Sequence, residues 1–235
     1  MSELLYHTDA YLREFDAVVT AVDTDQNAVS LDRTAFYPGG GGQPSDTGTL
    51  RTETGAFTVP AMKRPDLHVL KEPPPAVGST VHGVVDWERR YPLMRTHTAM
   101  HVLCGVVWRD YGAQVTGGNM EPGAGRMDFE FTRLDAALLE EIESKVNAEI
   151  SAGREVRVRI LPREEAFRIP DLIRTKINLL PEDITEVRTV EIVGLDLQAD
   201  GGTHVANTGE VGTVRLPKFK NKGGANKRIY LELMK

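Results

Sequence analysis

The chain has 235 residues, of which 40% are hydrophobic and 26% are charged, and its formal net charge is −6 at pH 7. This length allows one large or two small domains with an ordinary buried core, and the composition is typical of a soluble globular protein. The net negative charge excludes a protein that is basic overall and binds nucleic acid with its whole surface, but it does not exclude a local basic patch.

No targeting or membrane-spanning segment is evident. The start, Met1-Ser-Glu-Leu-Leu-Tyr-His7, has neither a basic head nor an apolar run of the length that a signal peptide needs, and no later run reaches the length of a membrane span. We therefore expect a cytoplasmic protein without a membrane partner. Cys104 is the only cysteine, which excludes an intramolecular disulfide, and a lone Cys among Val and Leu is typically a buried small hydrophobe.

Residues 1–90 are predicted to be rich in β-strands. The turn residues of segment 23–27 separate two β-prone runs and predict a hairpin. The expected strands are 15–22, 28–31, 47–52, 56–59 and 80–85. Several short strands punctuated by Gly and Pro suggest a small β-barrel.

Four consecutive glycines, Gly39, Gly40, Gly41 and Gly42, precede Gln43. They do not match a phosphate-binding loop, because no Lys-Ser or Lys-Thr pair and no helix follows them. Two interpretations of the glycine run are possible. The run is either a flexible hairpin loop, or a loop without side chains whose backbone N–H groups can touch a substrate or the end of a nucleic acid.

The charged segment 86–90, followed by Pro92, places a domain boundary at 86–94 and predicts domains at 1–90 and 91–235. From there, helices alternate with strands, so the second domain is expected to be α+β. Helices are predicted at 94–111, from Asp135 to just before Gly153, and at 162–168. Strands are predicted at 114–120, 126–131, 155–160 and 185–193, with a last hairpin of 210–216 and 228–233.

Two histidines, His97 and His101, are four residues apart in the first of these helices. Both imidazoles therefore leave one helix face, one turn apart, within reach of a single metal ion. Asp200 and His204 repeat the spacing far downstream, in a glycine-containing loop. Together the four side chains would supply nitrogen and oxygen ligands for zinc, although a histidine pair at this spacing can also be a coincidence of surface or core.

The end of the chain reverses the charge balance. Residues 214–235 hold seven basic residues and one acid, and Phe219 and two asparagines lie among the charges. Such a run is often only a solvated face, but it also suits phosphate contacts and base stacking on RNA. The predicted RNA-binding residues are Lys218, Lys220, Lys222, Lys227 and Arg228.

Four segments, in order along nearly the whole chain, resemble the alanyl-tRNA editing family, the free-standing relatives of the editing domain of alanyl-tRNA synthetase. They are Leu31-Asp-Arg-Thr-Ala-Phe-Tyr-Pro-Gly-Gly-Gly-Gly-Gln43, His97-Thr-Ala-Met-His101, Asp196-Leu-Gln-Ala-Asp-Gly-Gly-Thr-His204, and the tail Asn221-Lys-Gly-Gly with Arg228-Ile-Tyr230. The resemblance implies an N-terminal glycine-rich β-barrel followed by an α+β editing domain of the type that is additional in threonyl- and alanyl-tRNA synthetases.

The resemblance also implies that His97, His101 and His204 bind zinc and form the catalytic centre. The family usually has Cys at the fourth ligand position, whereas this sequence has Asp200. A carboxylate oxygen binds zinc at about 2.0–2.2 Å, so Asp can replace a thiolate. We favour ligation by Asp200 because it occupies the ligand position. The alternative leaves three histidines and an open position for water.

The activity implied by the resemblance is hydrolysis, without ATP, of the ester between serine or glycine and the tRNA for alanine. The water is either activated by zinc or positioned beside a substrate that zinc orders. Thr116 resembles the family residue that recognises the serine hydroxyl, and Gln114 is a second candidate; Thr116 can also be an ordinary strand residue. The glycine run with Gln43 would meet the acceptor end or the amino acid.

Two other functions are compatible with the same residues. One is a non-catalytic tRNA-binding module whose metal is structural, and the other is a metallohydrolase that acts on a small ester or amide without RNA. In either case we expect no DNA partner, and the sequence makes no prediction of the oligomeric state.

Overall fold

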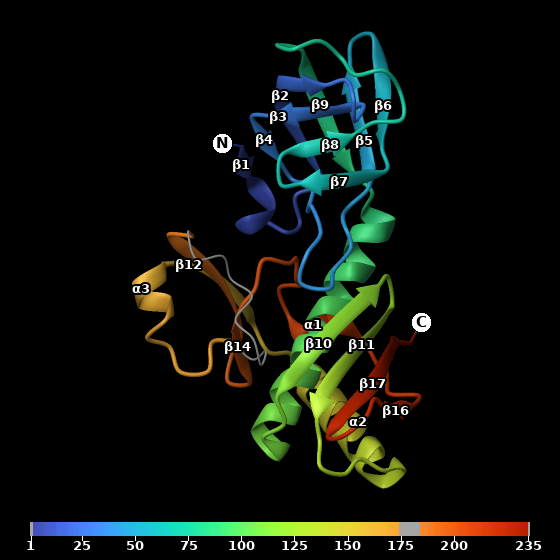
Figure 1. The fold of residues 1–235 in the computed structure, drawn as a ribbon, viewed down its shortest axis with the longest axis vertical. Coiled ribbons are helices and arrows are strands. Elements are labelled where there is room, and N and C mark those ends of the chain that lie inside the picture. Colours follow the sequence, from blue (N-terminus) through green and yellow to red (C-terminus); the bar gives the residue numbers. More distant parts are fainter. Residues whose placement is uncertain (1, 174–183, 235) are drawn as a thin grey trace. The chain divides into compact units, whose positions relative to one another are not determined.

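The computed structural model describes residues 2–173 and 184–234 (Figure 1). These residues form two compact units, Met1–Pro92 and Leu93–Lys235. Both units contain more strand than helix, so the chain is mixed α+β as the sequence predicts. Within the described ranges, no helix combines the length and the apolar character that crossing a membrane requires.

Unit 1 contains a seven-stranded antiparallel sheet in the order β6-β5-β9-β2-β3-β8-β7 (Figure 1). Its strands are β2 (Glu14–Asp23), β3 (Ala28–Leu31), β5 (Gly48–Thr52), β6 (Gly55–Val59), β7 (Ala61–Arg64), β8 (Leu67–Val69) and β9 (Thr80–Val85). The short strands β1 (Glu3–Leu4) and β4 (Arg33–Thr34) pair in parallel, and the single turn η1 (Leu5–His7) follows β1. Val19, Leu31, Phe36, Leu50 and Val81 are among the residues of its buried core.

The five strands predicted in this unit are all present, but the predicted barrel is not confirmed. The strand order ends at β6 and β7, and in the described part of the chain no pairing joins these two edges. β7 and β8 were not predicted. They are only four and three residues long, and β7 carries Lys63 and Arg64, so their pairing partners rather than local sequence make them strands.

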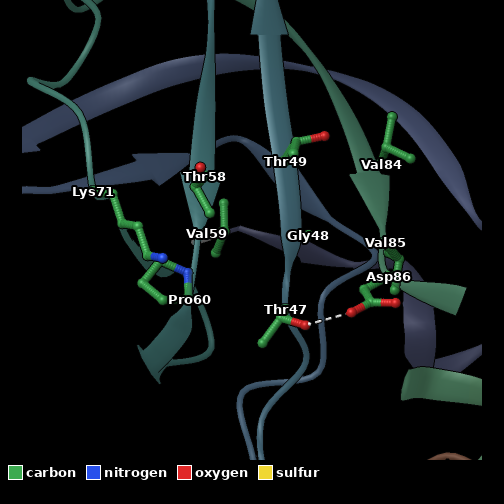
Figure 2. A pocket seen from close by; sticks show the side chains of 10 residues that line it. All are labelled: Thr47, Gly48, Thr49, Thr58, Val59, Pro60, Lys71, Val84, Val85 and Asp86. Carbon is green, nitrogen blue, oxygen red and sulfur yellow. Dashed lines mark hydrogen bonds between the residues drawn. The ribbon is translucent and has the colours of Figure 1, made fainter. Parts of the chain in front are cut away.

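A pocket of about 510 Å³ lies against β5, β6 and β9 of unit 1 (Figure 2). Thr47, Lys71 and Asp86 contribute polar groups to it, and the Thr47 hydroxyl donates to Asp86 Oδ2 at 3.0 Å. None of the residues that the sequence predicts to bind substrate lines this pocket.

A buried ion pair closes the base of the loop that carries the four glycines. Asp46 accepts from the backbone N–H of Tyr37 at 2.6 Å, and its own N–H donates to the Tyr37 carbonyl at 2.9 Å. The Arg90 guanidinium bonds to the Asp46 carboxylate and also donates to the carbonyls of Ala10 and Ala35. Both charged side chains are fully buried, so each depends on the other for its charge balance.

A second buried contact fixes the chain just before this loop. His68 Nε2 lies 2.8 Å from the Thr34 hydroxyl, which also accepts from the backbone N–H of Phe36 at 3.0 Å. His68 Nδ1 lies 3.2 Å from the carbonyl of Asp66, which fits a neutral ring protonated on Nδ1. Burial lowers the pKa of His68 to about 4.

Unit 2 holds most of α1 (Trp87–Tyr111) and all of α2 (Ala136–Ser151) and α3 (Arg163–Ala166). One sheet has the order β10-β11-β17-β15, with β16 also paired to β17, and a three-stranded sheet has the order β12-β13-β14. The strands of the first are β10 (Val115–Glu121), β11 (Ala124–Glu130), β15 (Val214–Arg215), β16 (Phe219–Asn221) and β17 (Asn226–Leu233). Those of the second are β12 (Val156–Pro162), β13 (Glu186–Ile192) and β14 (Asp196–Ala199).

Two predicted boundaries in this part of the chain are wrong. The helix predicted to begin at 94 begins at Trp87 and contains Pro92. Proline has no backbone N–H, so the helix loses one hydrogen bond at this residue but continues past it. The strand predicted at 210–216 is instead the 3₁₀ turn η2 (Thr208–Val211) followed by β15. A capping box causes this turn, because the side chain of Asn207 caps it and Glu210 reaches back to the Asn207 N–H.

We expect Arg90→Met to lower the free energy of unfolding by about 3–5 kcal/mol, because it leaves the buried Asp46 carboxylate without a charge partner. Urea unfolding of the full chain measures this loss. Arg33→Met is the matched control, since the ion pairs of Arg33 with Glu3 and Asp32 are exposed to solvent, and its effect should stay within about 0.5 kcal/mol. Equal effects of the two substitutions would contradict a stabilising role of the buried pair.

The low pKa of His68 predicts a loss of stability in acid. The unfolded chain binds a proton at this ring below about pH 6.5, whereas the folded chain does so only near pH 4, so stability is complete above pH 6.5 and falls as the pH decreases. This residue alone should account for about 3 kcal/mol between those values. Urea unfolding should show that the free energy of unfolding decreases less between pH 6.5 and pH 4 in His68→Gln than in the unchanged protein, by that amount. Identical pH profiles of the variant and the unchanged protein would contradict a low pKa of His68.

Candidate metal centre

Contacts from Arg95 and Thr96, just before His97, hold α1 in place. The Arg95 guanidinium donates to the carbonyl of Val211, and the Thr96 hydroxyl accepts from the backbone N–H of Gly123 at 3.0 Å. The hairpin of β10 and β11 lies directly on the helix at Gly125, where an added Cβ would be 2.8 Å from the sulfur of Met100. α1 is therefore held against the hairpin over the same turns that carry His97 and His101.

The loop after β14 brings Asp200 and His204 to the helix. Arg188 of β13, which is buried, donates from Nη1 to the carbonyls of Asp200 at 2.9 Å and Gly202 at 2.8 Å. Asp200 Oδ2 in turn accepts from the backbone N–H of Gly202 at 2.7 Å. These three bonds hold the loop in a tight turn, so that the Asp200 carboxylate points at the histidines.

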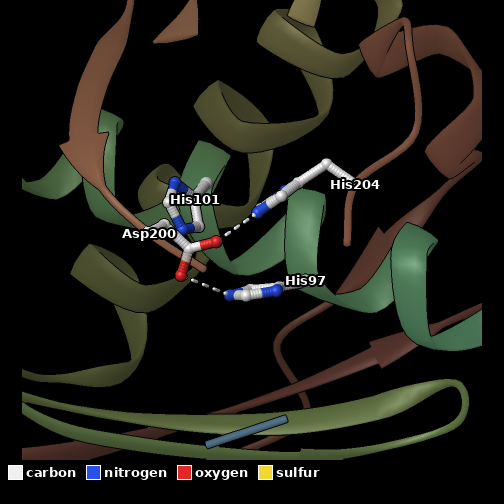
Figure 3. Close-up of side chains that lie close together, drawn as sticks. All are labelled: His97, His101, Asp200 and His204. Atoms are coloured by element: carbon white, nitrogen blue, oxygen red, sulfur yellow. Dashed lines mark hydrogen bonds and ion pairs between the residues drawn. The ribbon is translucent and has the colours of Figure 1, made fainter. Parts of the chain in front are cut away.

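The structure brings His97, His101, Asp200 and His204 into one cluster (Figure 3). One potential ligand atom of each lies within 4.8 Å of those of the others. His97 Nε2 is 3.6 Å from Asp200 Oδ1, and His204 Nε2 is 3.0 Å from Asp200 Oδ2. The three histidines are buried and Asp200 nearly so, which keeps water from competing strongly for the same atoms.

The Nδ1 atoms of His204 and His101 each lie beside a polar group of the protein. The Thr98 hydroxyl lies 3.2 Å from His204 Nδ1 and accepts from the backbone N–H of Val205. Asp196 Oδ2 lies 3.4 Å from Nδ1 of His101. In both rings the Nδ1 atom therefore faces the protein, which leaves Nε2 for a ligand inside the cluster.

The donor set fits a zinc ion. Burial lowers the pKa of His97 well below its usual value and that of His204 to about 4, so both rings are neutral near pH 7, which is the form of imidazole that binds a metal. Burial acts in the same direction on His101, but the nearby Asp196 and Asp200 outweigh it and raise the pKa of that ring. Three imidazoles and one carboxylate, converging at these distances, are ligands that zinc accepts.

The predicted recognition residues lie outside this cluster. Thr116 is the extra residue of a β-bulge in β10, between Val115 and Gly117, and its hydroxyl lies 3.1 Å from Asn226 Oδ1. Gln114 is exposed just before β10. Bulges are common where a strand re-aims a side chain near a functional site, so the bulge gives Thr116 an orientation that a regular strand would not.

The predicted glycine-rich loop lies in unit 1. All four glycines have positive φ, from 56° to 128°, and Gly40 and Gln43 exchange backbone hydrogen bonds of 3.0 and 2.9 Å. A side chain at these positions would be strained, so the run of glycines is required by the backbone path itself. Gln43 is buried, at 2% exposure.

The five predicted RNA-binding residues fall into two groups. Lys218, Lys220 and Lys222 are exposed, and the first two place their ammonium groups 4.8 and 5.7 Å from the ring centre of Tyr230. Lys227 is buried and donates to the carbonyl of Gly224, and Arg228 forms a two-bond ion pair with Asp128. Three of the five thus present charge to solvent, while two are engaged within the fold.

Comparison with known proteins shows which families this chain is similar to. Residues 187–230 match the family described as the threonyl and alanyl tRNA synthetase second additional domain, and residues 5–89 match the class II (A) tRNA synthetases. The chain is 41% identical to an alanyl-tRNA editing protein AlaX-M of Methanosarcina acetivorans over 100% of both chains. It is also 41% identical to one of Saccharolobus solfataricus over 98% of each. The chain belongs to the alanyl-tRNA editing protein AlaX-M family.

Longer proteins share the same region. An alanine–tRNA ligase of Pyrobaculum neutrophilum is 37% identical to this chain. The matched region covers 92% of this chain and 25% of the ligase. The family assignment confirms the resemblance drawn from the four motifs, and with it the connection to translation fidelity. The cluster of four side chains spans both motifs that carry histidine, and its last two residues fall inside the match to the additional domain.

Sequence reasoning missed three residues around the cluster, namely Thr98, Arg188 and Asp196. Thr98 and Asp196 both stand inside the matched motifs, beside or near the histidines. Their positions in the sequence could have indicated a role beside the cluster, because Thr98 follows His97 directly and Asp196 precedes Asp200 by four residues.

Substitution of Asp200 should show whether the carboxylate is a ligand. We expect Asp200→Ala to weaken zinc binding by more than about 100-fold, beyond what loss of an outer partner costs, and Asp200→Cys to retain it, because a thiolate can take the same position. Competition with a chromophoric chelator measures the affinity, and Asp128→Asn, which disturbs an ion pair elsewhere in the unit, is the control. Unchanged affinity in Asp200→Ala would support a site of three histidines.

Proposed function

We propose that this protein is a zinc-dependent hydrolase that removes serine, and also glycine, from mischarged tRNA for alanine. The observation that supports this most is the buried cluster of His97, His101, Asp200 and His204 in a chain that is similar over its full length to alanyl-tRNA editing proteins. The cluster has the side chains to hold a metal ion, and its similarity to alanyl-tRNA editing proteins supports an aminoacyl-tRNA substrate.

The chemistry that is required is modest. In hydrolysis a water oxygen adds to the ester carbonyl carbon, the bond to the ribose oxygen breaks, and the free amino acid and the tRNA leave. An aminoacyl ester is already activated, so no ATP is needed. When bound, zinc supplies Lewis acidity and an anchor for orienting the reacting groups.

The chain's own residues prepare the site. Burial keeps His97 and His204 neutral, and the bonds from Arg188 hold Asp200 in place before any ligand arrives. Such preorganisation reduces the entropy that must be lost when the substrate is positioned. The low exposure of the cluster also limits the water that can enter beside the reacting ester.

Recognition of the tRNA is proposed for two surfaces. The exposed Lys218, Lys220 and Lys222 lie just before, within and just after β16, and their positive charge suits phosphate contacts. The glycine-rich loop with Gln43 exposes backbone at Gly40 and Gly41, which suits contact with the acceptor end. For the amino acid, Thr116 is proposed to bond the serine hydroxyl, since a site built for that bond rejects alanine.

The test is hydrolysis of seryl-tRNA, glycyl-tRNA and alanyl-tRNA, all on the alanine tRNA. We expect release of serine and glycine but not alanine, loss of activity with a chelator, and recovery with added zinc. His97→Ala combined with His101→Ala should abolish hydrolysis and leave tRNA binding largely intact, because these residues hold the metal and not the phosphates. Full activity of this double variant would contradict the proposal.

The same assay distinguishes the two alternatives. A tRNA-binding module would bind the tRNA and release no amino acid in any condition. A hydrolase of small esters would act equally well at low and high salt, whereas the proposed enzyme should bind tRNA more weakly as salt rises. Replacement of Lys218, Lys220 and Lys222 by Ala should reduce that salt dependence, and Arg133→Ala, at a highly exposed site in the same unit, is the control.

A further inference from the structure

Asp196 is a buried carboxylate to which neither the sequence motifs nor the proposed reaction gives a role. It is the first residue of β14, and its side chain is fully buried. Its Oδ2 atom accepts from Nε2 of Gln198 at 2.6 Å and lies 3.4 Å from Nδ1 of His101. Burial of a carboxylate is costly unless other groups compensate it, so its position beside a metal-site histidine calls for a reason.

The backbone is shaped to allow this contact. Gly105 of α1 follows His101 by one helical turn, on the same face. An added Cβ there would be 2.9 Å from Cγ of Leu195, 3.0 Å from Cβ of Asp196 and 3.2 Å from the Leu195 carbonyl oxygen. The start of β14 therefore reaches α1 only because this residue is glycine, and the close approach sets Asp196 beside the His101 ring.

The two nitrogens of His101 then have separate tasks. Nδ1 lies 3.4 Å from Asp196 Oδ2 and, among the described residues, makes no hydrogen bond of standard geometry, so the carboxylate is the polar group that faces it. Nε2 is left for the interior of the cluster. A carboxylate behind an imidazole fixes the ring's tautomer and orientation and makes its other nitrogen a stronger donor to a metal.

We propose that Asp196 is a positioning residue that holds His101, through Nδ1, in the orientation and tautomer that bind the metal ion with Nε2. This inference rests on the proposed metal site, and it adds to that site a residue that does not touch the ion.

The charges around the cluster support this role. Arg188, a buried guanidinium, lies 3.9 Å from Asp200 Oδ2, so the site holds a positive charge before a divalent cation enters. Asp196 supplies a second buried negative charge on the far side of His101, which lowers the electrostatic cost of placing the cation there.

The alternative is that Asp196 only stabilises the start of β14 through Gln198. The two roles separate in Asp196→Asn, which keeps the size of the side chain and removes its charge. A positioning role predicts about 10–100-fold weaker zinc binding. A purely structural role predicts a lower melting temperature of the metal-free chain with unchanged zinc affinity in the folded protein.

The experiment is a zinc titration of the full chain in competition with a chromophoric chelator, repeated with cobalt, whose visible absorption reports the ligand field. Asp196→Asn should bind zinc about 10–100-fold more weakly and show an altered cobalt spectrum. Asp128→Asn, a matched loss of charge at a carboxylate paired with Arg228, should stay within about twofold of the unchanged protein, far from that range.

Gln198→Leu is a second variant should Asp196→Asn fail to fold. It removes the hydrogen bond from Gln198 to Asp196 Oδ2 while keeping the carboxylate itself, so Asp196 should be held less firmly against His101. We therefore expect weaker zinc binding, with a cobalt spectrum shifted in the same direction. If the unchanged protein binds zinc and Asp196→Asn, or Gln198→Leu in its place, binds it equally well, this inference is overturned while the metal site stands. If the unchanged protein binds no zinc, the proposed metal site itself fails.

Discussion

The candidate site depends on the contact between one helix and one loop. α1 carries His97 and His101, and the loop after β14 carries Asp200 and His204, so neither element alone holds a complete ligand set. Thr98 joins them, because its hydroxyl accepts from the N–H of Val205 and also meets Nδ1 of His204. Arg188 also holds the loop, through its bonds to the carbonyls of Asp200 and Gly202. The packing of the unit thus sets the geometry of the candidate site.

The same contacts explain how so many polar groups can be buried together. Imidazoles that burial keeps neutral cost far less to bury than charged ones, and the two carboxylates near them face a guanidinium and ring nitrogens. Such a cluster is still a poor way to stabilise a core, since apolar residues of similar volume would pack there at lower cost. Its presence in the described fold is better explained by a ligand than by stability.

The sequence was sufficient for the parts of the fold and site that depend on local spacing. The helical interval from His97 to His101 predicted that both face one way, and the strands around the glycine-rich loop were recognisable from their β-prone runs. Spacing could not show which distant groups meet. Whether Arg228 is free for RNA or paired with Asp128 depends on the register of β11 and β17, and the closure of a barrel depends on edges far apart in the chain.

Asp200 shows how a carboxylate can stand at the position where the resemblance to the editing family implies a Cys. A thiolate has one donor atom, whereas a carboxylate has two oxygens. Here Oδ2 accepts from the N–H of Gly202 and lies toward His204, while Oδ1 lies toward His97. One side chain can therefore fix the loop and still direct an oxygen into the cluster. Because oxygen is a harder and weaker donor to zinc than sulfur, such a site relies more on the strength of its histidines, and a carboxylate behind His101 supplies that strength.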